Sequence, residues 1–166
     1  METFIRPNIS AYISSHFSAH ALPPALIHAM LMVESTGNPF AMRFEPAFYD
    51  RYLKGKPLSF TPPSCSIDTE AIGRATSWGL LQIMGETARC LGFRGWFGEL
   101  LTPEIGLEWG CRYLARLRDR FLNTGGWEVV SRAYNGGPGN AHNPANTYPA
   151  KVLAHLPGGV WPQEGF

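Results

Sequence analysis

The chain has 166 residues, of which 45% are hydrophobic and 13% aromatic, so it can bury the sizeable core of one globular domain. Its formal net charge is +1, and it lacks a long basic run, which argues against binding to nucleic acid. No apolar run is long enough to span a membrane, and the first residues lack the pattern of a secretory signal. We therefore expect a single monomeric domain over residues 1–166 with no integral membrane segment.

Cysteine and histidine form no recognisable metal or redox pattern. The five His and three Cys include no Cys-x-x-Cys pair. Cys65, Cys90 and Cys111 are odd in number and far apart, which predicts free thiols rather than a disulfide scaffold. His16 and His20 have the i, i+4 spacing of a metal pair, but no third ligand lies close in sequence, so we interpret them as a solvated helix edge. The sequence predicts no metal and no cofactor.

Two helices are predicted near the start of the chain. A short amphipathic pattern covers residues 8–20, and a second helix runs from about Pro23 to Thr36. Proline is tolerated in a first helical turn, whereas the sequence Gly-Asn-Pro at 37–39 cannot continue a helix.

The second helix carries a carboxyl group at the end of an apolar stripe. Ile27, Met30, Leu31 and Glu34 fall at i, i+3, i+4 and i+7, so they share one face. Desolvation there disfavours the charged form and would raise the pKa of the carboxyl, which suits a general acid at neutral pH. The alternative is a partly exposed glutamate near a helix end.

Residues 40–76 are the least regular part of the sequence. A short helix is predicted after Pro46, and several Gly, Pro and Ser residues then break the chain into loop. Loops of this length are uncommon in compact domains unless they are functional. Four aromatic residues could form a packed core or stack on a ring-shaped ligand: Phe44, Phe48, Tyr49 and Tyr52.

The middle of the chain alternates short elements with glycine. Residues 77–84 resemble a small strand whose glycine, Gly79, marks a place where another backbone or a ligand comes close. Residues 85–92 read as a short helix that stops at Gly92.

The last third is predicted to be helical. A long helix begins at Thr102-Pro103-Glu104 with an N-cap and a proline in its first turn. Its buried face is predicted to consist of Leu107, Gly110, Cys111, Leu114, Leu117 and Phe121. A further helix runs from Trp127 to about Tyr134 and ends in the glycine-rich sequence Asn-Gly-Gly-Pro-Gly at 135–139, and a final short helix covers residues 147–156.

Five sequence blocks, taken in order, resemble the soluble lytic transglycosylase family. They cover roughly residues 24 to 155, and a set of ordered blocks is far more specific than any one of them. The blocks are Glu34-Ser35-x-Gly37-Asn38-Pro39, Ser77-x-Gly79-Leu80-x-Gln82-Ile83-Met84-x-x-Thr87-Ala88, Pro103-Glu104 with Gly110-x-x-Tyr113-Leu114, Ala133-Tyr134-Asn135-x-Gly137, and Thr147-Tyr148 with Lys151-Val152.

The resemblance implies a mainly α, lysozyme-like (goose-type) domain with a small β element and an insertion of about 40–76 after the catalytic helix. It implies cleavage of the β-1,4 bond between N-acetylmuramic acid and N-acetylglucosamine in peptidoglycan glycan strands, with a 1,6-anhydromuramoyl product. Glu34 would be the catalytic acid and then the base. The residues expected to bind substrate are Ser77, Gln82, Tyr134, Asn135 and Tyr148, with Glu45 of the insertion as a further candidate.

The chain departs from the family pattern at three places. The family joins the Glu-Ser block to the Ser-x-Gly-Leu block by a short link, whereas residues 35–76 intervene here. Gly85 stands where the family often has proline, and Gly106 where it often has asparagine.

Two other functions stay open at this point. A goose-type-like muramidase would hydrolyse the same bond with a second carboxylate, yet residues 73–83 contain no Asp or Glu. Four acids of the insertion could still reach the cleft: Glu45, Asp50, Asp68 and Glu70. A non-catalytic glycan-binding or tail module would keep the fold without the reaction. The substrate lies in the periplasm or cell wall and no signal peptide is visible, so release by a phage, delivery in a virion or export by a secretion system would each fit.

Overall fold

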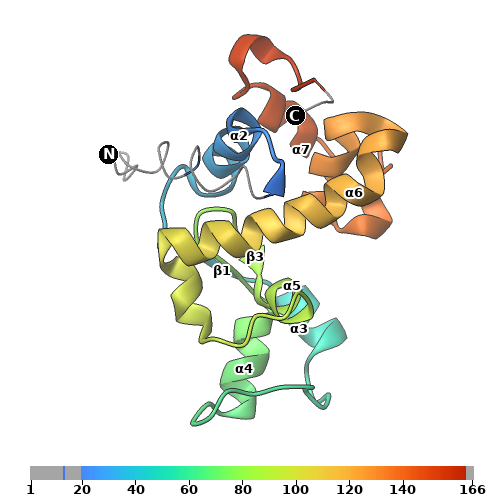
Figure 1. Cartoon of the computed structure of the whole chain (residues 1–166). Coiled ribbons are helices and arrows are strands. Elements are labelled where there is room, and N and C mark those ends of the chain that lie inside the picture. Colours follow the sequence, from blue (N-terminus) through green and yellow to red (C-terminus); the bar gives the residue numbers. More distant parts are fainter. Residues whose placement is uncertain (1–12, 14–19, 164–166) are drawn as a thin grey trace. The chain divides into compact units, whose positions relative to one another are not determined.

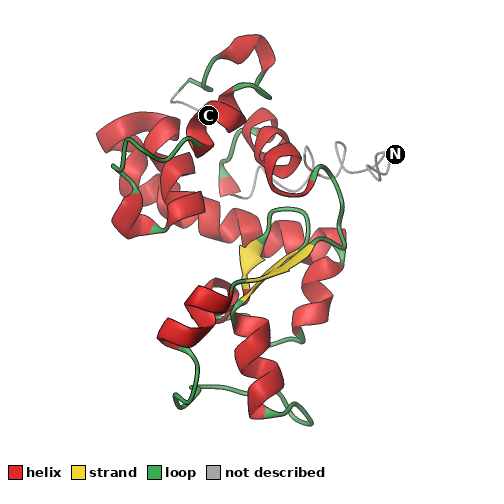
Figure 2. Cartoon of the chain, turned by 180° about the vertical axis from the view of Figure 1, so that it is seen from behind, coloured by secondary structure: helices red, strands yellow, loops and turns green. Residues whose placement is uncertain are grey.

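The structure is a computed structural model that describes residue 13 and residues 20–163 (Figures 1 and 2). It is 59% helix and 6% strand, so the predicted mainly α class with a small β element is confirmed. In chain order the elements are α2 (Pro24–Ser35), β1 (Met42–Phe44), α3 (Pro46–Tyr52), α4 (Ile67–Arg74), β2 (Thr76–Trp78), β3 (Ile83–Met84), α5 (Gly85–Cys90), η2 (Phe97–Leu101), α6 (Pro103–Gly136), η3 (Pro138–Asn140), α7 (Tyr148–Leu153) and η4 (Pro157–Gly159). The helix predicted over residues 8–20 and the His16–His20 pair lie largely outside the described residues.

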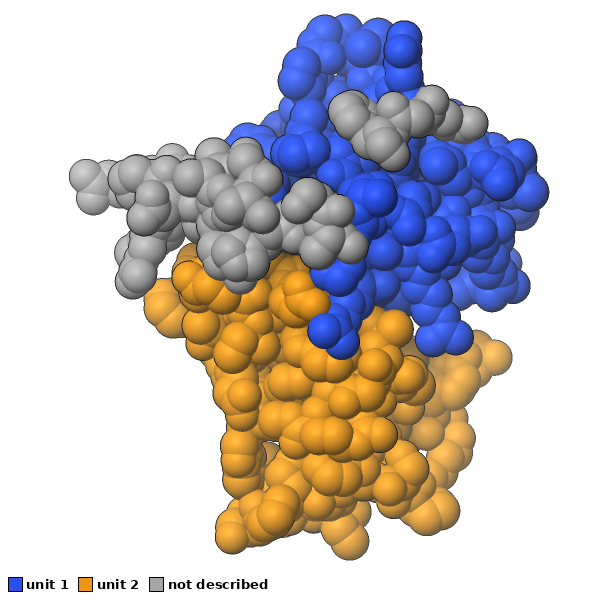
Figure 3. Space-filling view, in the orientation of Figure 1, with its two compact units in different colours: residues 1–37, 111–166 blue, residues 38–110 orange. Residues whose placement is uncertain are grey.

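The chain forms two compact units (Figure 3). Unit 1 comprises residues 1–37 and 111–166, and unit 2 comprises residues 38–110. Helix α6 begins in unit 2 and continues into unit 1.

In unit 1, helix α2 follows the sequence prediction closely. It starts with a proline at its first position and ends where Thr36 adopts a left-handed conformation (φ 52°) and donates its N–H to the carbonyl of Met32. Its apolar face is fully buried, and α2 packs against α7. The buried residues are Leu26, Ile27, Ala29, Met30 and Leu31.

Helix α6 combines the two helices predicted for the last third of the chain. The backbone leaves helical geometry at Gly125 and Gly126 (φ 62° at Gly126), so the segment from Trp127 is a separate run of helix. Every residue of the predicted buried face of the long helix is buried, and so are Trp127, Val130 and Tyr134, which share one face of the helix that follows. Because these patterns follow the helical period over many residues, the sequence was sufficient to place them.

In unit 2, a three-stranded antiparallel sheet has the order β1-β2-β3. The single strand predicted over residues 77–84 is wrong, because β2 and β3 form a hairpin in this stretch. Gly79 (φ 69°) and Gln82 (φ 46°) lie between the two strands in left-handed conformations. The expected close approach at Gly79 is confirmed, since a Cβ atom there would lie 2.4 Å from the carbonyl oxygen of Leu100.

The insertion at 40–76 is more regular than predicted. The helix after Pro46 is confirmed as α3, and the predicted loop is confirmed for residues 53–66. The stretch is nevertheless more regular than expected, because it also contains β1 and α4. Ser66 is the N-cap of helix α4, and its side chain accepts a hydrogen bond from the N–H of Thr69. Its buried face is built from small and charged residues, so no apolar stripe marked it in the sequence.

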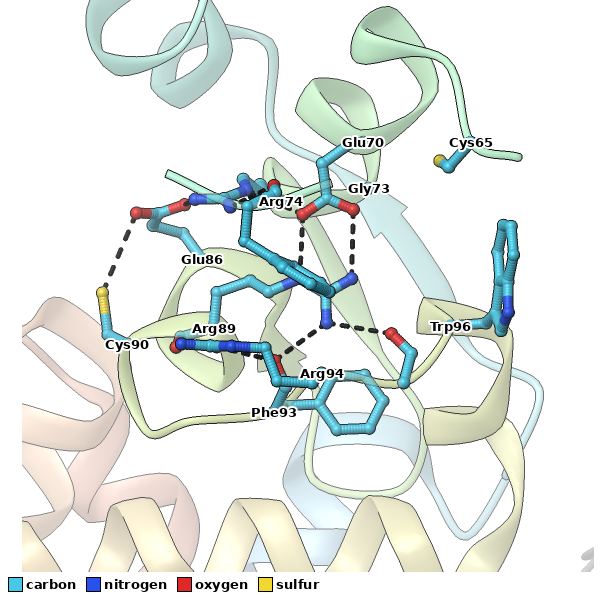
Figure 4. A network of polar contacts seen from close by, with 12 residues as sticks. Cys65, Glu70, Gly73, Arg74, Glu86, Arg89, Cys90, Phe93, Arg94 and Trp96 are labelled. Atoms are coloured by element: carbon cyan, nitrogen blue, oxygen red, sulfur yellow. Dashed lines mark hydrogen bonds and ion pairs between the residues drawn. The ribbon is translucent and has the colours of Figure 1, made fainter. Parts of the chain in front are cut away.

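A buried ion network joins α4 to α5 (Figure 4). Glu70 is 1% exposed. Its carboxylate accepts a hydrogen bond from Nε of Arg74 at 2.8 Å. It also accepts hydrogen bonds from Nε and Nη2 of Arg89 at 2.8 and 3.0 Å. Arg89 Nη1 also donates to the carbonyl oxygens of Phe93 and Gly95, both at 2.9 Å. Buried charges are tolerated only when paired and hydrogen-bonded, and this cluster meets that condition.

We expect Gly79→Ala to lower the free energy of unfolding by roughly 2–4 kcal/mol, because alanine adds strain at positive φ and a clash with the Leu100 carbonyl. Urea unfolding measures the effect. Gly98→Ala is the control, since its added Cβ meets nothing within 4 Å, and it should change stability by less than about 0.5 kcal/mol. Equal stability of the two variants would contradict the role of the contact at Gly79.

Candidate functional site

The site in unit 1 is centred on Glu34, in the last turn of α2. Its side chain is half-buried at the end of the apolar face that Ile27, Met30 and Leu31 form. The carboxylate lies close enough to the hydroxyls of Tyr134 and Tyr148 to affect the ionisation of both. The structure therefore brings together three of the site residues that the sequence predicted.

Tyr134 reaches this cluster from the last part of α6. It is buried, and its ring packs against that of Tyr113 with the ring centroids 5.3 Å apart. Burial raises the pKa of the Tyr134 phenol well above its usual value, and the negative charge of Glu34 raises it further, with smaller effects from Cys111 and Tyr113. Tyr134 is thus a neutral phenol across the physiological range.

Tyr148 is the first residue of α7 and reaches the cluster from that helix. Burial is again the main cause that raises the pKa of its phenol well above the usual value, followed by the charge of Glu34 and a hydrogen-bonding interaction with that carboxylate. Within the described part of the chain, the buried Tyr148 hydroxyl makes no hydrogen bond of standard geometry. We conclude that its interaction with Glu34 is mainly electrostatic.

These three groups can act together on a proton. A carboxyl group can give up or accept a proton at neutral pH, whereas each neutral phenol keeps its proton and can donate it in a hydrogen bond to the carboxylate. Two donors beside one carboxylate stabilise the charged form whenever the proton leaves. The arrangement therefore suits a single acid that must also work as a base.

Asn135 directly follows Tyr134 and is exposed. Its Oδ1 accepts a hydrogen bond from Nδ2 of Asn146 at 3.3 Å. Asn146 in turn accepts the backbone N–H of Tyr148 on its Oδ1 at 2.9 Å. Our sequence reasoning missed Asn146, although an Asn two residues before a helix start is a recognisable signal for a side chain that bonds to the backbone.

The other predicted residues belong to unit 2. Ser77 is buried on β2, and its hydroxyl contacts Sδ of Met84 at 3.3 Å. Gln82 donates from Nε2 to the carbonyl oxygens of Ala41 and Gly79 at 2.9 and 2.8 Å. In this structure both side chains support the hairpin, and their contact with substrate stays a prediction.

Glu45 and the aromatic residues of the insertion also lie in unit 2. Glu45 is half-buried and pairs with Nε of Arg43 at 2.6 Å. Phe44 contacts Tyr49, and Phe48 contacts Tyr52, with ring centroids 5.7 and 4.9 Å apart. Phe44 and Tyr52 keep 43% and 48% of their surface exposed, so the insertion offers aromatic surface as well as internal packing.

Two pockets lie within unit 2 and both involve the insertion. One of about 300 Å³ lies between α4, β2 and η2 and is bounded by Cys65, Ile72, Trp78 and Trp96. The other, of about 510 Å³, is lined entirely by residues of the insertion between Tyr49 and Ala71. Both volumes are within the range of small-molecule sites, about 300–1,000 Å³. A glycan-binding role for the insertion stays a prediction.

In residues 20–163 and residue 13, no three His, Cys, Asp or Glu side chains are grouped so that they could hold a metal ion. Over the same part of the chain, no helix is both long and apolar enough to cross a membrane.

The raised pKa values of Tyr134 and Tyr148 predict a loss of stability in alkali. An unfolded tyrosine ionises near pH 10, whereas these two retain their protons when folded. The unfolded state therefore binds fewer protons above about pH 10, and the free energy of unfolding should fall there by up to about 1.4 kcal/mol per pH unit for each tyrosine.

Urea unfolding between pH 8 and 11 measures this slope. A variant with Tyr134→Phe and Tyr148→Phe should show a clearly shallower decline than the parent, because phenylalanine does not titrate. The same slope in both proteins would show that the two phenols are not protected from ionisation by the fold.

The comparison with known protein families agrees with this geometry. A family model described as the transglycosylase SLT domain matches residues 11–153. No solved structure matches the chain. The mainly helical architecture with a small three-stranded sheet is consistent with the lysozyme-like fold of such a domain. Because the match spans most of the sequence, the chain belongs to the transglycosylase SLT domain family of peptidoglycan-cleaving enzymes.

Proposed function

We propose that this protein is a lytic transglycosylase that cleaves the β-1,4 bond between N-acetylmuramic acid and N-acetylglucosamine and leaves a 1,6-anhydromuramoyl end. Glu34 acts as the general acid and then as the base. The observation that carries the proposal is the half-buried carboxyl of Glu34 beside two buried, neutral tyrosines, in a chain of this family.

In the first step, protonated Glu34 gives its proton to the glycosidic oxygen. The bond between that oxygen and C1 of the muramic acid breaks, and C1 takes on oxocarbenium character. The leaving sugar keeps the electron pair and the new hydroxyl proton. Glu34 is left as a carboxylate, and the neutral hydroxyls of Tyr134 and Tyr148 stabilise that charge as it forms.

In the second step, the Glu34 carboxylate accepts the proton of the muramic acid 6-hydroxyl. The O6 oxygen then bonds to C1 and closes the 1,6-anhydro ring, so no water enters the product. Glu34 is returned to its protonated form, which completes the cycle. The substrate supplies the nucleophile, and one protein carboxyl is therefore enough.

The other acids of unit 1 support a mechanism with one carboxyl. Among the described residues of unit 1, the remaining acidic side chains are Asp119 and Glu128. Asp119 is paired with Arg118, and Glu128 with Arg132. Neither belongs to the group formed by Glu34 and the two tyrosines, so the described part of unit 1 places no second carboxylate beside Glu34 to activate water.

We further propose that Ser77, Gln82, Asn135 and Glu45 contribute to substrate binding, as the family resemblance implies. The enzyme would act in the periplasm or cell wall after release by a phage, delivery in a virion or export by a secretion system. A hydrolytic reaction would require a second carboxylate, for which Glu45 is the candidate from the insertion.

We expect Glu34→Gln to lower the rate of cell-wall degradation by at least about 10³-fold with little change in melting temperature, because the amide keeps the size of the side chain but cannot transfer the proton. Turbidity of a wall suspension gives the rate. Glu104→Gln, an exposed acid at the start of α6, is the control and should retain full activity.

Mass spectrometry of the digested wall distinguishes the mechanisms. Anhydro ends in the digest of the parent protein support the transglycosylase, whereas reducing ends would indicate a muramidase. A parent protein that releases no fragments would point to a binding module, and substantial activity of the Glu34→Gln protein would overturn the role of Glu34.

For Tyr134→Phe we expect about a 10- to 100-fold lower kcat, because the ring that packs against Tyr113 is kept and only the donor beside Glu34 is lost. A thermal melt and a rate measured on the same preparation separate catalysis from folding. An unchanged rate would assign Tyr134 to the core alone.

A further inference from the structure

The hydrogen bonds around Asn146 have a fixed direction. The chain of bonds starts at the backbone N–H of Tyr148, which can only donate, and ends on Oδ1 of Asn146 at 2.9 Å. The other end of the Asn146 amide must therefore be its NH₂ group. The orientation of this amide therefore follows from a backbone donor, whose polarity is fixed.

The same reasoning fixes the orientation of Asn135. Nδ2 of Asn146 is a donor, so the atom of Asn135 that it meets at 3.3 Å must be the acceptor Oδ1. The Asn135 carbonyl is thus occupied inside the protein, and its NH₂ group is left to bind elsewhere. Because Asn135 is exposed, that group can donate to a ligand.

The surrounding loop holds Asn146 in place. A Cβ atom added to Gly136 would lie 3.0 Å from Nδ2 of Asn146 and 3.1 Å from Cβ of Asn140, so both side chains pack over this glycine. Asn140 also donates to the carbonyl oxygen of Gly136 at 2.7 Å. Asn146 itself is half-buried. The amide therefore has little room to turn over.

We propose that Asn146 is a positioning residue that sets the polarity of the substrate contact made by Asn135. It connects the start of α7, where Tyr148 lies beside Glu34, to the residue that follows Tyr134. Asn135 then presents a donor, and never an acceptor, to the glycan. This inference rests on the proposed function, because it assigns a role within the same site.

The donor that Asn135 presents indicates which kind of substrate atom it binds. A sugar hydroxyl can donate or accept, so it would bind either end of an Asn135 amide. A carbonyl oxygen can only accept and therefore benefits from a fixed donor. In peptidoglycan such oxygens belong to the acetamido groups of the sugars and to the lactyl group of muramic acid. The site is thus selective for a carbonyl of the glycan strand.

The test uses Asn146→Asp in the full chain. Aspartate keeps the acceptor for the Tyr148 N–H but offers a second acceptor toward Asn135, so the Asn135 amide must turn over and present its carbonyl to the substrate. We expect kcat/KM on soluble glycan fragments to fall by about 10- to 100-fold, mainly through a higher KM, with kcat changed by less than about threefold.

Asn143→Asp is a matched control in the same loop. It adds the same charge and keeps the acceptor that Asn143 offers to the backbone N–H of Ala145 at 3.1 Å. Its kcat/KM should stay within about threefold of the parent value. Equal kinetic effects of the Asn146 and Asn143 variants would overturn the proposal in favour of a general effect of charge in the loop.

Modified substrates identify the carbonyl. If the carbonyl that Asn135 binds is an acetamido oxygen, de-N-acetylated glycan should bind the parent weakly. On that glycan Asn146→Asp should then lower kcat/KM by less than about threefold. If the carbonyl is instead the lactyl oxygen, reduction of the lactyl group should abolish the loss of kcat/KM that Asn146→Asp causes. If Asn146→Asp lowers kcat/KM on both modified glycans as much as on the unmodified glycan, the proposal is overturned.

The parent protein separates this test from the test of function. A parent that makes no anhydro product contradicts the proposed reaction, whereas an active parent whose Asn146→Asp variant is kinetically normal contradicts only the role of Asn146. Thermal melts of both aspartate variants complete the comparison, because a purely structural role would lower the melting temperature without a change in KM.

Discussion

The arrangement of unit 1 is centred on one carboxyl group that lies beside two buried phenols. Helix α2 brings Glu34 to the end of an apolar face, and α6 and α7 bring Tyr134 and Tyr148 to the same place. Each phenol stays neutral because burial and the nearby negative charge both oppose its ionisation. A carboxyl with such neighbours can lose and regain a proton without a second ionisable partner.

The loop between α6 and α7 fixes the direction of the hydrogen bonds next to this cluster. Its asparagines bond to backbone groups, which have a fixed polarity, and one of them passes that polarity on to the exposed Asn135. Side-chain amides are otherwise ambiguous, because their two ends have nearly the same shape. The backbone removes the ambiguity, so this short loop fixes which end of the Asn135 amide is engaged by Asn146 and which end is left exposed.

Unit 2 shows a different solution to the burial of polar groups. Glu70 is shared by Arg74 and Arg89, and the Arg89 guanidinium also lies 4.1 Å from the centre of the Phe97 ring. Its further bonds to the carbonyls of Phe93 and Gly95 fix the turn before η2. The network joins segments that carry few large apolar residues, and it supports the part of the chain that contains the β2–β3 hairpin.

The sequence by itself determined the elements whose pattern is local. Helices α2 and α6 were predictable because their apolar residues repeat with the helical period, and proline and glycine mark their ends. The close approach at Gly79 was predictable because only glycine tolerates it. The ordered motif blocks also selected Glu34, Tyr134 and Tyr148, which the structure brings together.

Only the tertiary structure decided the features that depend on partners far apart in sequence. Helix α4 has no apolar stripe, because it buries Glu70 and Arg74 and one of their partners, Arg89, lies on another helix. The β2–β3 hairpin escaped prediction because its turn is held by bonds from Gln82 to Ala41 and Gly79 rather than by a recognisable turn sequence. Asn146 escaped for the same reason, since its importance lies in connecting Tyr148 to Asn135 across a loop. Hydrogen bonds between distant segments leave no periodic trace in a sequence, so the fold must be known before they can be seen.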